Sequence, residues 1–341
     1  MATLVLFAGG FIWVQSRGRD AAPVSPYGIP RGILARYFAD AIRHHDYQVS
    51  ASTLHAWLRS SKSVVLIDLR QPGGTDGYNR GHIAGAHNIP LQWFGTELTA
   101  THRFTKRVPV DNGTMGVHFF ALPHHTPIVI MCYDGNGGEM TPVILRVLGY
   151  QAFGLRDGVS SWNPRLNVWP PATAIDNLPL VTGSAPGSLS LSRPPRGVDV
   201  LGSSWDARLK PFWQHLNHVY PLGYSRPWTI DANALWALLA GPNPPEVIDL
   251  RTPGQFKAGH IKGSLNIPFG QLGANLSRVS GTRQVVLVSR TLQEAAAANA
   301  ILRLLGYHSD VLKKGLVTWN NRVGSIESPH HYGVVFGPKR G

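Results

Sequence analysis

The sequence predicts two α/β domains, each built on a parallel sheet that helices cover on both faces. Three observations predict this fold class. The chain has 341 residues, which is long for one domain and comfortable for two. A long stretch of sequence occurs twice. In each copy, continuously apolar strand-like segments alternate with helix-like ones, as expected for strands that are buried on both faces.

The duplication is the strongest of these observations. Residues 64–90 read VVLIDLRQPGGTDGYNRGHIAGAHNIP, and residues 246–268 read EVIDLRTPGQFKAGHIKGSLNIP. Asp68 in the first copy aligns with Asp249 in the second at an offset of 181 residues. Because the match includes the order and spacing of many residues, it indicates two domains of one fold.

The offset changes along the chain and locates an insertion. His82 aligns with His260 at an offset of 178, and Cys132 aligns with Ser289 at an offset of 157. The difference places 21 extra residues in the first copy between His82 and Cys132. We expect an irregular stretch there, at about 95–125, and our hypothesis is that it shapes access to Cys132.

Each copy has the same expected order of elements: a helix, an apolar strand, a Gly-rich turn, a second strand, and a second helix. In the first copy these helices and strands are expected at Ser52–Arg59, Val64–Leu69, Ile128–Met131 and Glu139–Leu148. In the second copy they are expected at Ala232–Leu239, Val247–Leu250, Val285–Val288 and Gln293–Leu305.

The repeats set the expected domain boundaries. We place the first domain at 30–165 and the second at 228–325. The stretch between them, 166–227, is rich in Pro, Gly and Ser, which is the composition of a linker. A short helix is expected within it, at Trp205–Tyr220.

The N-terminal segment 1–20 is set apart by its apolar residues. Residues 2–14 are almost wholly apolar but too few to cross a bilayer, which needs about 20. They match the apolar part of a signal peptide or a weak membrane anchor. This predicts the cell envelope, with the protein periplasmic or associated with a membrane through 2–14. The alternative is a short buried segment that caps the first domain of a cytoplasmic protein.

The chain is strongly basic, with a net charge of +13 and a pI near 10.2. The Lys and Arg residues are scattered, and no finger or helix-turn-helix spacing accompanies them. We therefore predict no nucleic-acid partner. The basic surface suits small anions or an acidic membrane face.

The single cysteine, Cys132, excludes an intramolecular disulfide. It directly follows an expected strand and precedes a Gly-rich turn and a helix, so it stands at the sheet edge where α/β proteins bind ligands. The turn comprises Tyr133, Asp134, Gly135, Asn136, Gly137 and Gly138. Inward-facing N–H groups of such a turn and a helix N-terminus form a cradle for an anion. We therefore expect Cys132 to be a thiolate near neutral pH.

A series of short motifs runs through the first copy: Asp68-Leu69-Arg70, Gly81-His82-Ile83, Gly85-Ala86, Asn88-Ile89-Pro90, Cys132 with Gly135 and Asn136, Leu148-Gly149-Tyr150, Asp157-Gly158 and Trp162. With these motifs the sequence resembles the rhodanese (sulfurtransferase) family across both repeats. Each motif alone is weak, but in this order, and with most of them present twice, they are specific.

The resemblance implies that a sulfane sulfur passes from a small donor, such as thiosulfate, through a Cys132 persulfide to a thiol, cyanide or another nucleophilic acceptor, including a protein. It implies residues 133–138 as the persulfide-binding loop and no cofactor besides the covalent persulfide. Asp68 and Arg70 resemble the family's pair beside the site, and we interpret them as structural support. His82 and His260 occur in both copies, which favours a role in fixing a turn.

The chain departs from the family pattern in ways that affect the chemistry. Gly137 stands where the family loop often carries arginine, and Asp134 and Glu139 add negative charge, which disfavours a dianionic donor. Ser289 replaces the cysteine in the second copy, so we interpret that domain as a catalytically silent partner that packs against the first. A non-catalytic sensor or interaction module remains the alternative function.

The residues argue against two other kinds of site. A cysteine phosphatase needs an arginine in its loop, and residues 133–138 contain neither Arg nor Lys. His118, His124 and His125 lie close together in the sequence, but no carboxylate or cysteine spacing completes a metal site. We therefore predict exposed loop histidines and no bound metal.

Overall fold

The structure is a computed structural model. It describes residues 31–44, 47–74, 77–91, 103–109, 115–121, 123, 125–147, 150–166, 228–290 and 292–323. The apolar segment 2–14, the helix expected at Trp205–Tyr220 and all but the first residue of the linker 166–227 lie outside these ranges. Within them, no helix is both long enough and apolar enough to span a bilayer.

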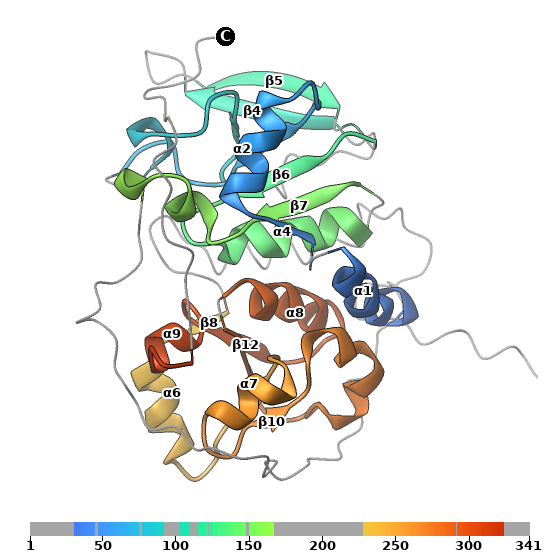
Figure 1. The fold of residues 1–341 in the computed structure, drawn as a ribbon, viewed down its shortest axis with the longest axis vertical. Helices are drawn as coiled ribbons and strands as arrows, with labels where there is room; N and C mark the ends of the chain where they lie inside the picture. Colours follow the sequence, from blue (N-terminus) through green and yellow to red (C-terminus); the bar gives the residue numbers. More distant parts are fainter. Residues whose placement is uncertain are drawn as a thin grey trace, which may run out of the picture.

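The first domain is built on a five-stranded parallel sheet (Figure 1). Its strands lie in the order β1 (Gln48–Val49), β7 (Ala152–Leu155), β6 (Ile128–Met131), β2 (Val65–Asp68) and β3 (His87–Asn88). Every residue of the central strand β6 is buried, because both faces of the sheet are covered. Asp68, at the end of β2, pairs in register with Met131, the residue before Cys132.

The second domain repeats this sheet strand for strand. The order is β8 (Thr229–Ile230), β12 (Ser309–Leu312), β11 (Val285–Val288), β9 (Glu246–Asp249) and β10 (Leu265–Asn266). All of its strand pairs are parallel. Ser289 follows β11 as Cys132 follows β6. The predicted fold class, two α/β domains with parallel sheets, is confirmed.

Helices cover the outer face of each sheet. Leu54 of α2 (Ala51–Arg59) packs on the first sheet, and Leu235 of α6 (Ala232–Leu239) packs on the second together with α9 (Leu316–Trp319). Helix α7 (Pro253–Ala258) follows β9. The remaining short helical turns are η2 (Tyr78–Arg80), η3 (Gly158–Ser161), η4 (Pro164–Leu166), η6 (Phe269–Gln271) and η7 (Gly273–Arg278).

Three helices lie between the two sheets and join the domains into one core (Figure 1). They are α1 (Arg31–Arg43), α4 (Asn136–Val147) and α8 (Gln293–Leu304). Helix α4 packs directly on α8, whose run of buried alanines at 295–298 allows a close approach. Phe38 of α1 stacks edge-on against Phe269 of the second domain at 5.4 Å. The second domain therefore packs against the face of the first domain that carries Cys132.

The insertion in the first domain is not wholly irregular, so that prediction is wrong. Strands β4 (Arg103–Pro109) and β5 (Met115–Ala121) form an antiparallel hairpin, with Arg103 opposite Ala121 and Pro109 opposite Met115. The sequence contains a signal for such a hairpin that we did not use, since Asn112-Gly113 is a dipeptide typical of hairpin turns.

Candidate active site around Cys132

Cys132 lies at the carboxyl end of the central strand β6, immediately before α4. Its Sγ accepts hydrogen bonds from the backbone N–H groups of Gly135 at 3.2 Å and Gly138 at 3.3 Å. Helix α4 begins at Asn136, three residues earlier than we predicted, so Gly138 belongs to its first turn. The sulfur is therefore held by two amides, one of which is at a helix N-terminus.

The loop owes its shape to its glycines. Gly135 has φ +106°, a conformation that side-chain-bearing residues rarely adopt. Its carbonyl accepts the N–H of Glu139 at 2.9 Å and so starts α4. A Cβ on Gly137 would lie 3.1 Å from Leu91, so this position is closely packed. The Tyr133 ring lies 6.0 Å from the Arg70 guanidinium carbon.

A second segment of the first domain holds the loop from behind. The N–H of Val159 donates to the Cys132 carbonyl at 2.9 Å, and the Ser160 hydroxyl donates to the Tyr133 carbonyl at 2.8 Å. Gly158, with φ +59°, lies so close that a Cβ there would be 2.5 Å from the Cys132 oxygen. The sequence indicates Asp157-Gly158 only as part of the family pattern and gives no signal for Ser160.

The protonation state of Cys132 differs from our expectation. Burial raises the pKa of the thiol to about 11, and the nearby Asp134 carboxylate adds to the rise. The N–H groups of Gly138, Gly135 and Asp134 lower the pKa but do not offset burial. The side chain is only 7% exposed and belongs to the core shared by the domains. The prediction of a thiolate near neutral pH is therefore wrong for the resting protein.

The second acidic residue that we had placed near the site points elsewhere. Asp134 is buried in the loop, with 2% exposure. The Glu139 carboxylate, by contrast, lies against Gly154 of β7, close enough to overlap a Cβ there. The Asp134 carboxylate raises the pKa of Cys132.

Asp68 and Arg70 form a buried ion pair with a 2.7 Å contact from Nη2 to Oδ2. Arg70 Nη2 also donates to the Gly81 carbonyl at 2.7 Å, so the pair ties the end of β2 to the following turn. The Asn88 amide donates to the carbonyls of Asp68 and Arg70 at 3.0 and 2.8 Å. These contacts support our interpretation of the pair as structural.

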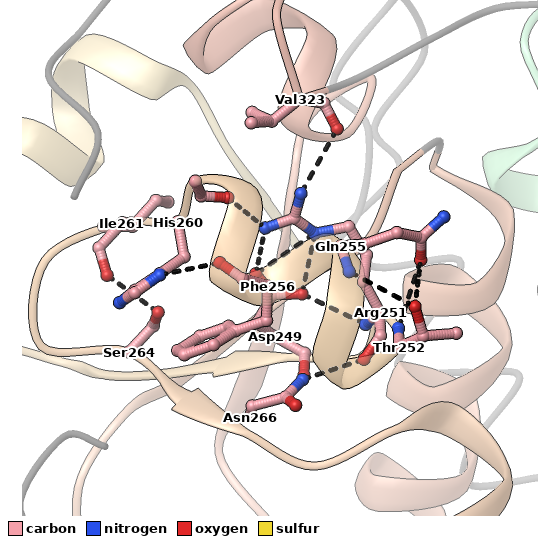
Figure 2. A network of polar contacts seen from close by, with 11 residues as sticks. Asp249, Arg251, Thr252, Gln255, Phe256, His260, Ile261, Ser264, Asn266 and Val323 are labelled. Atoms are coloured by element: carbon pink, nitrogen blue, oxygen red, sulfur yellow. Dashed lines mark hydrogen bonds and ion pairs between the residues drawn. The ribbon is translucent and has the colours of Figure 1, made fainter. Parts of the chain in front are cut away.

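The second domain contains the same network without a cysteine beside it (Figure 2). Arg251 Nη2 contacts Asp249 at 2.6 Å and the Gly259 carbonyl at 2.7 Å, and Asn266 replaces Asn88. His260 bonds the Phe256 carbonyl at 2.9 Å, as His82 bonds the carbonyl of Tyr78 at 3.0 Å. The network does not depend on the thiol, which supports our interpretation that it fixes the turn.

Ser289 is fully buried and accepts the N–H of Ala295 at 3.3 Å. Four residues later, Gln293 reaches across to the first domain and donates to the Asp134 carbonyl and to Asp157 Oδ1, both at 3.1 Å. We did not predict this contact. The family motifs around Cys132 do not predict this contact, because Gln293 belongs to the copy that lacks the cysteine.

Other features lie away from the thiol. A cavity of about 460 Å³ opens on the outer side of the second sheet between Trp236, Ile261 and Trp319, and no residue of the cysteine loop lines it. Within the described ranges, no three His, Cys, Asp or Glu residues are grouped to hold a metal ion. His118 lies in β5, not in a loop; His125 is exposed, and His124 lies outside the described residues.

A family model for the rhodanese-like domain matches residues 50–164 and 231–322, which together make up more than half of the chain. The chain therefore belongs to the rhodanese-like family and contains the domain twice. The protein YqhL of Bacillus subtilis, itself uncharacterized, is 31% identical over 85 residues, or 25% of this chain and 68% of YqhL.

Two further kinds of relative were found. The HTH-type transcriptional regulator Rv0324 of Mycobacterium tuberculosis is 32% identical over 75 residues, which are 21% of this chain; the chain spans only 33% of that regulator. Among solved structures, a thiosulfate sulfurtransferase from Pseudomonas aeruginosa is 18% identical over 88% of this chain and 49% of its own, with a TM-score of 0.28. A rhodanese-like protein from Staphylococcus aureus is 21% identical over 27% and 89%, with a TM-score of 0.26.

Proposed function

We propose that this protein is a sulfurtransferase that carries a sulfane sulfur as a persulfide on Cys132. The observation that carries the proposal is the seating of the sulfur, which accepts two main-chain N–H groups at the carboxyl end of the central strand. Such donors stabilise negative charge on the thiolate and on the outer sulfur of a persulfide.

The reaction has two displacements that balance. The Cys132 thiolate attacks the sulfane sulfur of a donor, an S–S bond forms, and the donor's own S–S bond breaks with the electron pair leaving on the departing group. The thiolate of an acceptor then attacks the outer sulfur of the persulfide. A new S–S bond forms on the acceptor, and Cys132 leaves as thiolate. No net oxidation occurs and no metal or cofactor is consumed.

The raised pKa of Cys132 puts a condition on the first step. Because the resting thiol is protonated at neutral pH, a proton must pass to solvent base or to the donor before attack. If the incoming donor displaces the groups that cover Cys132, the thiol becomes less buried and its pKa falls. We therefore propose that donor binding and thiol deprotonation are coupled.

The loop also favours a class of donor. Residues 133–138 contain no cation, and the Asp134 carboxylate is buried among them. A dianion such as thiosulfate gains little there, whereas a neutral polysulfide or a protein-bound persulfide avoids the repulsion. We propose a donor of the second kind, with a small or protein thiol as acceptor.

The burial of the thiol favours a second candidate, a non-catalytic rhodanese-like module. A cysteine that is 7% exposed, with a pKa near 11, has the properties of a structural cysteine. The two candidates differ in whether sulfur ever becomes attached to Cys132.

The test is direct because the chain has one cysteine. The purified protein is incubated separately with thiosulfate, an organic trisulfide and glutathione persulfide, and the intact mass is measured. We expect the added mass of one sulfur on the wild type with the persulfide. With the trisulfide we expect the added mass of one sulfur and one organic thio group, because attack on its central sulfur expels only one thiolate. Cys132→Ser should gain neither. If every donor leaves the wild-type mass unchanged, the non-catalytic module is the better description.

A further inference from the structure

The second domain contributes a side chain to the cysteine loop. Gln293 is the first residue of α8 and is fully buried between the domains. Its Nε2 donates to the Asp134 carbonyl and to Asp157 Oδ1, each at 3.1 Å. Both partners are acceptors, so only the nitrogen of the Gln293 amide can face them.

The bond to Asp134 acts on the peptide group that holds the sulfur. The carbonyl of Asp134 and the N–H of Gly135 belong to one peptide unit, which is planar and trans, so they point in opposite directions. Gln293 binds the oxygen of this unit, and Cys132 Sγ accepts its hydrogen at 3.2 Å. Fixing the oxygen fixes the direction of the hydrogen, and the bond to the oxygen makes that hydrogen a stronger donor.

The bond to Asp157 joins this peptide to the segment behind the loop. Asp157 has φ 55° and precedes Gly158, whose backbone lies against the carbonyls of Cys132 and Tyr133. One amide group of Gln293 thus bridges the two segments of the first domain that surround the cysteine.

The absence of a side chain at Gly135 makes room for Gln293. A Cβ at Gly135 would overlap the Gln293 amide nitrogen. Glycine at this position therefore serves both the positive φ of the turn and the approach of the second domain.

We propose that Gln293 is a positioning residue for Cys132, and that the domain without a cysteine is for this reason part of the active site. Gln293 orients the Asp134–Gly135 peptide so that its N–H stabilises negative charge on the sulfur. The consequence for sulfur transfer rests on the proposed function, but the consequence for the reactivity of the thiol does not.

The test compares alkylation of Cys132 by iodoacetamide across pH in Gln293→Met, which keeps the length of the side chain and removes its donor. We expect the alkylation profile to move to higher pH, with a rate at pH 9 lower by about three- to tenfold, since one hydrogen bond to the thiolate is weakened. Gln293→Lys keeps a donor and should alkylate at least as fast as the wild type.

Asn299→Ala is the matched control. Asn299 is a buried amide on the same helix, but its oxygen accepts the Ser309 hydroxyl at 2.7 Å within the second domain. This variant perturbs α8 without touching the loop, so its alkylation profile should match the wild type. Urea denaturation monitors folding of each variant.

The proposal is overturned if Gln293→Met keeps the wild-type profile, or if Asn299→Ala shifts it equally. Should the methionine variant not fold, Gln293→Lys decides, and a shift of its profile to higher pH contradicts the proposal. If no donor produces a persulfide but Gln293→Met still slows alkylation, the proposed function fails and the positioning role stands. If the persulfide forms and the profile does not move, the positioning role fails alone.

Discussion

Cys132 and Ser289 occupy the same place in their two sheets, and each accepts an N–H from the residue six positions later at 3.3 Å. The donors are Gly138 and Ala295. The backbone around the two residues differs at the other donor position. Gly135 has φ +106°, whereas Leu292, which aligns with it, has φ −74°. The second domain thus retains the helix-terminal part of the cradle but not the glycine turn that supplies the second amide.

Moving the cysteine to the second domain should therefore not move the activity. In the double variant Cys132→Ser, Ser289→Cys, we expect persulfide formation at least about tenfold slower than in the wild type, because the left-handed Gly135 turn that directs an N–H at the sulfur has no counterpart at Leu292. Intact mass at timed intervals measures this rate. Equal rates in the two proteins would show that the Gly135 turn is dispensable.

Alkylation of Cys132 should rise steeply with pH. Burial raises the pKa of this acid to about 11, so the thiolate fraction grows about tenfold per pH unit between pH 7 and pH 10 and levels off above pH 11. The rate of iodoacetamide labelling, followed by mass, gives this profile. The same reaction in urea supplies the control, since the unfolded thiol should titrate near its ordinary value. A folded profile that levels off below pH 8 would contradict the prediction.

Asp134→Asn should lower the pKa of Cys132. The Asp134 carboxylate is the second cause of the raised pKa, after burial, and its removal ends a repulsion between two negative charges. We expect alkylation at pH 8 to be roughly three- to tenfold faster than in the wild type. Glu139→Gln is the matched control, because its carboxylate lies against Gly154 in β7, and it should leave the rate unchanged.

The sequence predicts those features that depend on residues close together in the chain. Asp68 and Asp249 end aligned strands, and the two sheets have the same strand order because the repeat fixes both. The expected strands at Ile128–Met131 and Val285–Val288 have the bounds that the structure gives them. Strong apolar patterning makes such buried strands the most readable elements of an α/β fold.

What the sequence did not reveal depends on contacts between distant segments. Gln293 acts on Cys132 only because α8 packs on α4, and no local pattern encodes that packing. The pKa of Cys132 was mispredicted for the same reason. The glycines that supply its amides are visible in the sequence, but the core that buries the sulfur comes from both domains. Local hydrogen bonds were predictable, and desolvation was not.

Arg70→Ala should destabilise the protein, by about 3–5 kcal/mol, because it leaves the fully buried Asp68 carboxylate without its cation. Arg251→Ala should cost a similar amount, since its pair with Asp249 is also buried and Arg251 likewise donates to a carbonyl of the following turn, that of Gly259. Urea denaturation of both variants measures the costs. If Arg70→Ala left stability unchanged but abolished persulfide formation, Arg70 would belong to the chemistry and our structural interpretation would be wrong.

Alanine should be tolerated at Gly138 and not at Gly135, although both glycines donate to the same sulfur. A Cβ at Gly138 would meet Cys132 N at 3.4 Å and Cys132 Sγ at 3.5 Å, which are ordinary contacts, and the second domain has Ala295 at this position. A Cβ at Gly135 would instead overlap the Gln293 amide and force alanine into a φ of +106°. We expect Gly135→Ala to lower the free energy of unfolding by about 1–3 kcal/mol and Gly138→Ala to change it by less than about 1 kcal/mol. Urea denaturation distinguishes the two, and equal costs would mean that neither the turn nor the contact with the second domain requires glycine at 135.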